Sequence, residues 1–261
     1  MPGAKISLKH RLFCRIFPQI AAYIPDRLAY LTSLGLGRAL GFCVQRSADS
    51  YPMCRDGRSM IVGRCLREFG ILGKAFDLPL IVQGLDHVQA AHSQHRRLVL
   101  VSIHLPLNVC VHRALFPLGI PATIITGSNV TFRSVCGIPE APRPAIACPG
   151  PLLYFKVRSA LNEERIVLAS IDRPSWYRDR MIGLTPGPIE FAARTETPVV
   201  FFATALDRNG DIRVVFSRAH IGAILRDQAA CLESFATFMR PFVGEPDQFF
   251  WESRHATRRA A

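Results

Sequence analysis

The chain has 261 residues, and its 32 lysines and arginines outnumber its 20 aspartates and glutamates, which gives a net charge of +12. Hydrophobic residues make up 49% of the sequence, a share that excludes a disordered or collagen-like chain. The mean hydropathy is positive, +0.18, although the pI is about 9.9. A chain that is both basic and apolar suits contact with an anionic membrane surface, which we expect to be one of its partners.

The first 50 residues are expected to form a helical, membrane-associating segment. Apolar residues recur there at helical spacing between cations, before the first acidic residue, Asp26. A second apolar stretch, residues 28–44, is interrupted by Arg38 and is shorter than the ~20 residues that a spanning helix needs. Two alternatives stay open: ordinary packed helices whose cations face water, and a single tilted span over residues 20–44. The cations of the first stretch are Lys5, Lys9, Arg11 and Arg15.

The eight cysteines contain no CxxC pair, and most of them stand in apolar runs. They are typical of reduced, buried thiols in a cytosolic chain. His104, Cys110 and His112 are close in sequence, but their spacing matches no zinc pattern and no second ligand pair accompanies them. We therefore expect no metal and no other cofactor. No signal peptide is expected either, because the start lacks a compact apolar stretch before a small-residue cleavage site.

Residues 51–261 are expected to form one α/β domain. After a polar, turn-prone stretch at residues 47–57, residues 58–76 have the pattern of an amphipathic helix that ends at Asp77 and Pro79. Apolar, β-branched runs then alternate with helical segments, which predicts a largely parallel sheet covered on both faces. Ligands collect at the carboxyl ends of such strands, and His104 comes directly after one of them. The expected strands are residues 80–83, 98–103, 122–126, 166–171, 199–205 and 212–216, and the expected helices include residues 86–92, 107–116 and 189–194.

Four segments carry a resemblance to a known family. They are IVQGLDHVQAAHSQHRRLVLVSIHLPLNV, LNEERIVLASIDRPSW, LTPGPIEFAARTETPVVFFATALDRNGDIRVVF and EPDQFFWESRH. In this order they resemble bacterial lipid A biosynthesis acyltransferases, the lauroyl and myristoyl transferases of the lysophospholipid acyltransferase superfamily. The similarity runs over residues 80–255, roughly two thirds of the chain.

This resemblance implies a fold, a reaction and a location. The fold is a mixed, largely parallel central sheet flanked by helices. The reaction moves a fatty acyl group from a thioester of acyl carrier protein or coenzyme A to a hydroxyl of a lipid or glycolipid acceptor. The location is the cytoplasmic face of the bacterial inner membrane, held there peripherally or by a single span.

His104 is the expected general base of that reaction. Acyl transfer to a hydroxyl needs a group that takes the alcohol proton, and histidine has the ordinary pKa closest to working pH. In the family that the chain resembles, an Asp or Glu stands five residues after this histidine. Here that position is Val109, and residues 96–133 contain no carboxylate. Loss of the orienting acid costs about 10⁴ in turnover in the serine-protease triad, so a replacement is needed for full activity.

Two residues are candidates for that replacement. Asn108 could hold a ring N–H through its carbonyl oxygen, although a neutral amide does not offset the charge of an imidazolium. Asp172 follows the expected strand at residues 166–171, so it could reach His104 from another strand end. The alternative for Asp172 is a helix or turn cap before Pro174.

Further residues are expected to bind substrate. Thr185 and Gly187 precede the helix at residues 189–194, where backbone N–H groups could hold a phosphate or a developing oxyanion. Cations near the expected site are suited to phosphates, and Lys156 with Arg158 is the preferred pair because both precede the strand that ends at Asp172. The other cations are Arg173, Arg178 and Arg180, and the expected lining of the acyl chain is Leu105, Leu107 and Phe132.

Two other functions compete with an active transferase. A catalytically degenerate relative would bind lipid or acyl carrier without turnover, which the missing acid at Val109 favours. A nucleic-acid-binding protein fits the charge of +12, but the basic residues form no dense stripe with interleaved aromatic residues and no nucleic-acid motif is present. We therefore expect no nucleic-acid partner.

Overall fold

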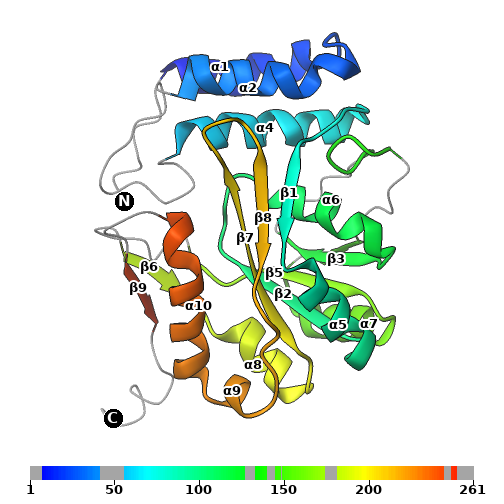
Figure 1. The fold of residues 1–261 in the computed structure, drawn as a ribbon, viewed down its shortest axis with the longest axis vertical. Coiled ribbons are helices and arrows are strands. Elements are labelled where there is room, and N and C mark those ends of the chain that lie inside the picture. Colours follow the sequence, from blue (N-terminus) through cyan, green and yellow to red (C-terminus); the bar gives the residue numbers. More distant parts are fainter. Residues whose placement is uncertain are drawn as a thin grey trace.

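The structure is a computed structural model, and it describes residues 8–41, 56–126, 133–139, 145–147, 149–173, 181–243 and 248–251. Within these residues the protein is an α/β fold with a mixed, mostly parallel central sheet flanked by helices, as the sequence predicted (Figure 1).

The described part of the central sheet has seven strands in the order β1-β8-β7-β2-β5-β3-β4. Strands β7, β2, β5, β3 and β4 run parallel to one another, whereas β8 is antiparallel to β7 and pairs in parallel with β1. The strands are β1 Leu80–Gln83, β2 Leu98–Ser102, β3 Ala122–Ile125, β4 Ala145–Ala147, β5 Ile166–Ser170, β7 Val199–Leu206 and β8 Ile212–Phe216.

The central strands are apolar on both sides because helices cover both faces of the sheet. All five residues of β2 are buried, and its neighbour β5 is almost as apolar. Alternate side chains enter two cores: Leu100 packs in one and Val101 in the other. The first core contains α4 Gly57–Leu72, α5 Leu85–His95 and α6 Val111–Leu115, and the second contains α7 Leu153–Asn162, α8 Gly187–Arg194, α9 Ala223–Arg226 and α10 Gln228–Val243.

The amino-terminal helices α1 (Leu8–Ala21) and α2 (Ala29–Leu40) form a hairpin that lies on α4 (Figure 1). The ring of Phe17 meets that of Phe69 edge-on, with the centroids 5.6 Å apart. Gly37 allows α2 to approach α4 closely, since a Cβ there would lie 2.8 Å from Val62 and 3.2 Å from the Arg58 carbonyl oxygen. The hairpin therefore shares the first core with the α/β domain, while the expected boundary at residue 50 lies outside the described residues.

The connection between α1 and α2 is fixed to the domain by Lys74. Its Nζ donates to the carbonyl oxygens of Ala22 and Ile24, at 2.9 and 2.8 Å, and lies 3.3 Å from a carboxylate oxygen of Asp26. Because the chain turns back here, the alternative of one continuous span over residues 20–44 is wrong for its described part. Among the described residues, each helix is too short or too polar to cross a bilayer.

Several elements differ from the sequence prediction. Helix α4 ends at Leu72, four residues early, because Gly73 adopts a left-handed conformation (φ 78°) and its N–H turns back to the carbonyls of Phe69 and Gly70. The helix expected over residues 107–116 is divided into short 3₁₀ and α turns, and Pro117 in the last of them has no N–H to continue an α-helix. Helix α10 and the parallel pair β6 (Met181–Leu184) and β9 (Gln248–Trp251) were not predicted.

Candidate active site

His104 and Asp172 meet at the carboxyl edge of the sheet. The register pairs Ser102 of β2 with Ser170 of β5, so the residues two places further along each strand leave the sheet side by side. The Nδ1 atom of His104 lies 2.9 Å from Oδ1 of Asp172, and the same oxygen accepts the backbone N–H of His104 at 2.9 Å. An ionised carboxylate can only accept, so it holds the ring with Nδ1 protonated and leaves Nε2 as the basic nitrogen.

The backbone on both sides of Asp172 is fixed by strand pairing. The N–H of Ile171 donates to the Ser102 carbonyl at 2.9 Å, which extends the β5–β2 ladder by one residue. The N–H of Arg173 donates to the Gly183 carbonyl at 2.8 Å, and Asp172 itself bridges to Leu184 of β6. The Asp172 carboxylate thus fixes the backbone of His104, two residues after the end of β2. The expected contact between Asp172 and His104 is present, and its catalytic use remains a prediction.

The two members of this pair differ in exposure. The Asp172 side chain is 0% exposed, whereas that of His104 is 51% exposed. Burial raises the pKa of Asp172 from its ordinary 3.8 to about 7, although the N–H from His104 acts in the opposite direction. Burial also lowers the pKa of His104, so the ring is neutral and able to accept a proton at neutral pH. Groups this close titrate as a pair.

The second carboxylate oxygen of Asp172, Oδ2, is buried and has no hydrogen-bond partner among the described residues. An uncompensated buried charge is costly. The cost of burying this charge accounts for the raised pKa of Asp172. The same low-dielectric surroundings make the negative carboxylate a stronger partner for a positive imidazole ring beside it.

Asn108 has a different role from the one expected. Its Nδ2 donates to the Ile103 carbonyl at 2.6 Å, and its Oδ1 accepts from the Thr204 hydroxyl at 2.9 Å. The prediction that this oxygen holds the His104 ring is therefore wrong, because the loop after β2 curls back and ties Asn108 to β7. Asn108 positions the loop that carries His104, while Asp172 holds the ring.

In the family that the chain resembles, an acid stands five residues after the histidine. The residue at that position here, Val109, is apolar. Val109 is half-buried and packs against the first core, and its carbonyl accepts from the thiol of Cys136 at 3.4 Å. The carboxylate beside His104 thus comes from β5 rather than from the turn that follows the histidine.

The structure brings Arg173, Thr185 and Gly187 to the edge where Asp172 lies. The Thr185 N–H donates to the Ile171 carbonyl at 2.6 Å, and Nη2 of Arg173 lies 3.5 Å from the Thr185 hydroxyl. Helix α8 then begins at Gly187, where an added Cβ would meet only the Thr185 hydroxyl, at 3.8 Å. These three residues therefore form an open shelf next to Asp172.

The preferred cation pair lies elsewhere. Arg158 is exposed and lines a cavity of about 340 Å³ with Arg97, which precedes β2, and Thr197, which precedes β7. That cavity is at the amino edge of the parallel strands, because α7 runs back toward the start of β5. The prediction that Arg158 serves the site is therefore wrong, and Lys156, exposed on the same helix, makes no contact with His104 or Asp172. Arg178 and Arg180 lie outside the described residues.

The expected acyl-chain lining is also wrong in its described part. Leu107 is 1% exposed and belongs to the first core, and Leu105 is buried in the second. Phe132 lies outside the described residues. An apolar cavity of about 110 Å³ lies instead between α7, α8 and the sheet. Its lining includes Gly187, Phe191, Tyr154, Val157, Val167 and Ala169.

A polar cavity of about 230 Å³ lies at the ends of β3 and β5, and the sequence analysis missed it. It shares Ile125 and Ala169 with the apolar cavity. Its lining combines apolar and polar residues from α4, α6, β3, β5, β7 and the 3₁₀ turn at residues 108–110, so no single stretch of sequence marks it. The polar members are Arg67, Asn108, His112, Thr126 and Ser170.

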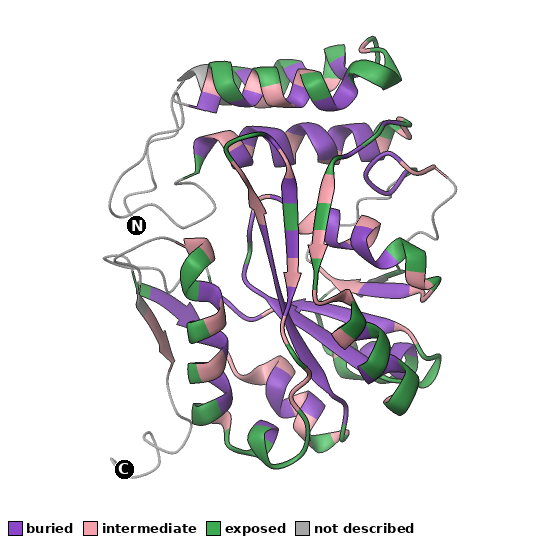
Figure 2. Cartoon of the chain, viewed as in Figure 1, coloured by how far each residue is buried: buried purple, intermediate pink, exposed green. Residues whose placement is uncertain are grey.

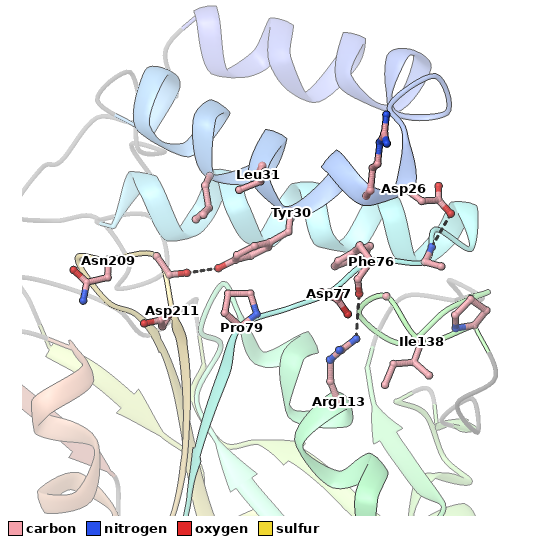
Figure 3. Close-up of a pocket in the computed structure, with 16 residues that line it drawn as sticks. Asp26, Tyr30, Leu31, Phe76, Asp77, Pro79, Arg113, Ile138, Asn209 and Asp211 are labelled. Atoms are coloured by element: carbon pink, nitrogen blue, oxygen red, sulfur yellow. Dashed lines mark hydrogen bonds between the residues drawn. The ribbon is translucent and has the colours of Figure 1, made fainter.

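A further cavity, of about 840 Å³, lies under the α1–α2 hairpin (Figure 3). Several of its polar groups already hold neighbouring loops: the Tyr30 hydroxyl donates to the Gly210 carbonyl, and Arg113 donates to the carbonyls of Phe76 and Cys136. Its lining thus joins the hairpin to the β7–β8 turn, away from the His104–Asp172 pair.

The three residues considered as metal ligands do not converge. The Cys110 thiol lies 4.0 Å from that of Cys136, whereas His112 faces the polar cavity. Across the described ranges, no group of three histidine, cysteine or acidic side chains has a metal-binding arrangement.

No protein-family model matches this sequence, and no curated protein is similar enough to be counted as its relative.

Proposed function

We propose that this chain is a membrane-associated acyltransferase that moves a fatty acyl group from a thioester to a hydroxyl of a lipid or glycolipid. The observation that supports this most is the half-exposed imidazole of His104, held 2.9 Å from the fully buried carboxylate of Asp172. The four segments that resemble lipid A acyltransferases favour an acceptor of the lipid A type. They favour acyl carrier protein or coenzyme A as the carrier of the donor thioester.

In the proposed reaction, Nε2 of His104 takes the proton of the acceptor hydroxyl as its oxygen attacks the thioester carbonyl carbon. A C–O bond forms, and the carbonyl oxygen becomes negative. Asp172 stabilises the imidazolium through Nδ1–H. The C–S bond then breaks, and the leaving thiolate takes the proton from Nε2, which gives an ester and a free thiol.

The shelf at the start of α8 is suited to the negative oxygen of that intermediate. Pro186 and Pro188 have no N–H, so the first turn of α8 offers the N–H groups of Gly187 and Ile189, and Gly187 leaves the approach to its own N–H open. Arg173 stands at the same edge and adds positive charge. Gly187 also lines the apolar cavity, so an acyl chain whose carbonyl sits at the shelf would extend between α7 and α8.

The outer face of the α1–α2 hairpin supports membrane contact. Leu12, Ile16 and Ile20 lie one helical turn apart on α1, and all three are exposed. Tyr23 (86% exposed), which follows α1, and Leu31 (63% exposed), on α2, are further exposed apolar side chains of the hairpin. Exposed positions recur along the hairpin (Figure 2). A patch of this kind is typical of a helix that lies in a membrane interface, where nearby cations attract anionic lipids. The exposed cations of the hairpin include Arg15, Arg27 and Arg38.

The transfer reaction is tested with purified protein, labelled acyl-carrier-protein and coenzyme A thioesters, and an extract of bacterial membrane lipids. We expect His104→Gln to lower the rate of labelled lipid formation by about 10²–10⁴, because a general base contributes that much. The matched control is His87→Gln, another partly exposed histidine beside an aspartate, which lies on α5. Equal rates for the parent and His104→Gln would remove His104 from the mechanism.

The binding-only alternative rests on the apolar residue at Val109. It predicts that the parent chain retains labelled acyl carrier or lipid on a gel-filtration column but forms no labelled ester with either donor. That result would replace the transferase proposal, whereas ester formation that depends on His104 would remove the alternative.

Membrane contact is tested by sedimentation with vesicles of phosphatidylglycerol and phosphatidylethanolamine. Replacing Leu12, Ile16 and Ile20 together by serine should lower vesicle affinity at least about tenfold, because each buried aliphatic side chain contributes about 1.5–3 kcal/mol. The matched control replaces two exposed residues elsewhere by serine: Leu152, which precedes α7, and Phe155 of α7. Binding of the parent should weaken as salt rises. Equal losses in both variants would remove the hairpin as the contact surface.

A further inference from the structure

The polar cavity at the ends of β3 and β5 is lined by an arginine whose charge no carboxylate of the described residues neutralises. Helix α4 contributes Arg67 to its wall, and no carboxylate lines the cavity among the described residues. Two other arginines of α4 are engaged: Arg64 pairs with Glu68 at 2.9 Å, and Arg58 donates to the carbonyls of Asp207 and Arg208. Arg67 has no hydrogen bond or ion pair to any described residue. Its half-buried guanidinium is therefore available to a ligand.

The remaining polar groups of this cavity add hydrogen-bond donors. Burial lowers the pKa of His112 to about 4, so its ring is neutral at pH 7 and offers one N–H. Ser170, at the end of β5, lines the same cavity and carries a hydroxyl that can donate. A volume of about 230 Å³ exceeds the ~30 Å³ that one water occupies in the liquid, so a phosphate group has room beside Arg67.

The cavity also lies beside the candidate catalytic pair. Ser170 is the last residue of β5, and Asp172 follows it by two residues along a chain that continues the strand pairing at Ile171. Asn108, on another wall, is bonded to the carbonyl of Ile103, the residue before His104. A ligand in this cavity therefore touches the two segments that carry His104 and Asp172.

We infer that this cavity, the Arg67 pocket, binds a phosphate group of one of the two substrates. The inference rests on the proposed function for the identity of that substrate. Two sources share this chemistry: a phosphate on the lipid acceptor, and the phosphate of the pantetheine arm that carries the donor thioester. A planar guanidinium with several donors around it matches phosphate geometry.

Binding is measured directly, without turnover, by titrating inorganic phosphate into protein with ¹⁵N-labelled histidine. In the parent, the ring signals of His112 should shift saturably. Arg67→Gln should weaken this binding about tenfold or more, because a charge-assisted hydrogen bond is lost. Arg158→Gln, which changes an exposed arginine at the amino edge of the sheet, is the matched control and should bind as the parent does. A parent whose His112 signals do not saturate, or an Arg67→Gln variant with unchanged affinity, would overturn the inference.

Steady-state kinetics identify which substrate supplies the phosphate. If the acceptor supplies it, Arg67→Gln raises the acceptor KM about tenfold, leaves the donor KM unchanged, and loses this effect with a dephosphorylated acceptor. If the donor supplies it, the donor KM rises instead, and the difference disappears with an N-acetylcysteamine thioester, which has no phosphate.

The two proposals fail in different ways. A chain that binds phosphate through Arg67 but transfers no acyl group would retain the pocket and remove the proposed function. An active enzyme that binds no phosphate and whose KM values are unchanged by Arg67→Gln would support the proposed function and contradict the phosphate-binding role of the pocket.

Discussion

The two edges of the parallel sheet both carry cavities and cations, but they hold their charged side chains differently. At the amino edge, Arg97, Arg158 and Arg194 are exposed around a cavity of about 340 Å³ that also contains Glu196. At the carboxyl edge, one fully buried carboxylate, that of Asp172, is fixed against a half-exposed imidazole.

The difference teaches that positive charge beside a cavity does not by itself define a site. Exposed arginines are solvated and flexible, so they contribute little fixed field. Burial of Asp172, in contrast, raises its pKa to about 7 and gives it a single partner ring. Pairing and burial therefore distinguish the candidate site from an ordinary basic surface.

The strongest test of this difference between the two edges is to remove the buried charge of Asp172. Asp172→Asn retains an acceptor for the His104 backbone N–H but cannot stabilise an imidazolium, so we expect transfer to fall by up to about 10⁴. The measurement is the rate of labelled ester formation. Asp86→Asn, at the exposed pair in which His87 lies 3.8 Å from its carboxylate, is the control and should remain active. Equal activity of Asp172→Asn and the parent would contradict the assignment.

The pH dependence of the transfer rate and of the stability tests the same buried carboxylate. Transfer needs neutral His104 and ionised Asp172, so the rate should rise with pH through about 7, the pKa of Asp172. The folded state holds the Asp172 proton more tightly than the unfolded chain, so stability should decline as pH rises from near 4 to 7, by about 4 kcal/mol at most. Urea unfolding at pH 5 and pH 8 should show this decline in the parent and a smaller one in Asp172→Asn. Parallel pH profiles of the two proteins would refute it.

A smaller effect is expected where the carboxyl edge meets the apolar cavity. Val157→Phe adds bulk to the wall that α7 gives to that cavity, away from the shelf at Gly187, so long acyl chains should be obstructed while the shelf stays open. We expect the KM for a dodecanoyl donor to rise about tenfold, with little change for a butanoyl donor, because only the longer chain needs the cavity. A uniform loss with both donors would place the acyl chain elsewhere.

The smallest effect is expected at the amino edge. Arg158→Ala removes an exposed cation that contacts neither His104 nor Asp172, so the rate and the thermal midpoint should stay within about twofold and a few degrees of the parent. A large loss of transfer in this variant would mean that the two edges do not differ as their burial indicates.

The sequence predicted the elements whose patterns are local. The runs at β2 and β5 are apolar up to a final serine and follow an arginine, so their positions and burial follow from the local sequence. His104 could be placed at a strand end for the same reason. Helix α10 was missed. The short strands β4, β6 and β9 were missed as well, because three or four residues become a strand only when a partner strand accepts their hydrogen bonds.

The sequence by itself determined that this protein is an α/β fold with a histidine at the end of a buried strand and a conspicuous gap where an acid was expected. Only the tertiary structure decided that β2 lies next to β5 in a register that places Asp172 beside His104. It also decided that Asn108 is hydrogen-bonded to Thr204. It also decided that Arg67 and His112, from separate helices, line one cavity. The physical reason is that strand order, register and helix packing depend on contacts between residues far apart in the chain, which local hydrophobic patterns do not encode.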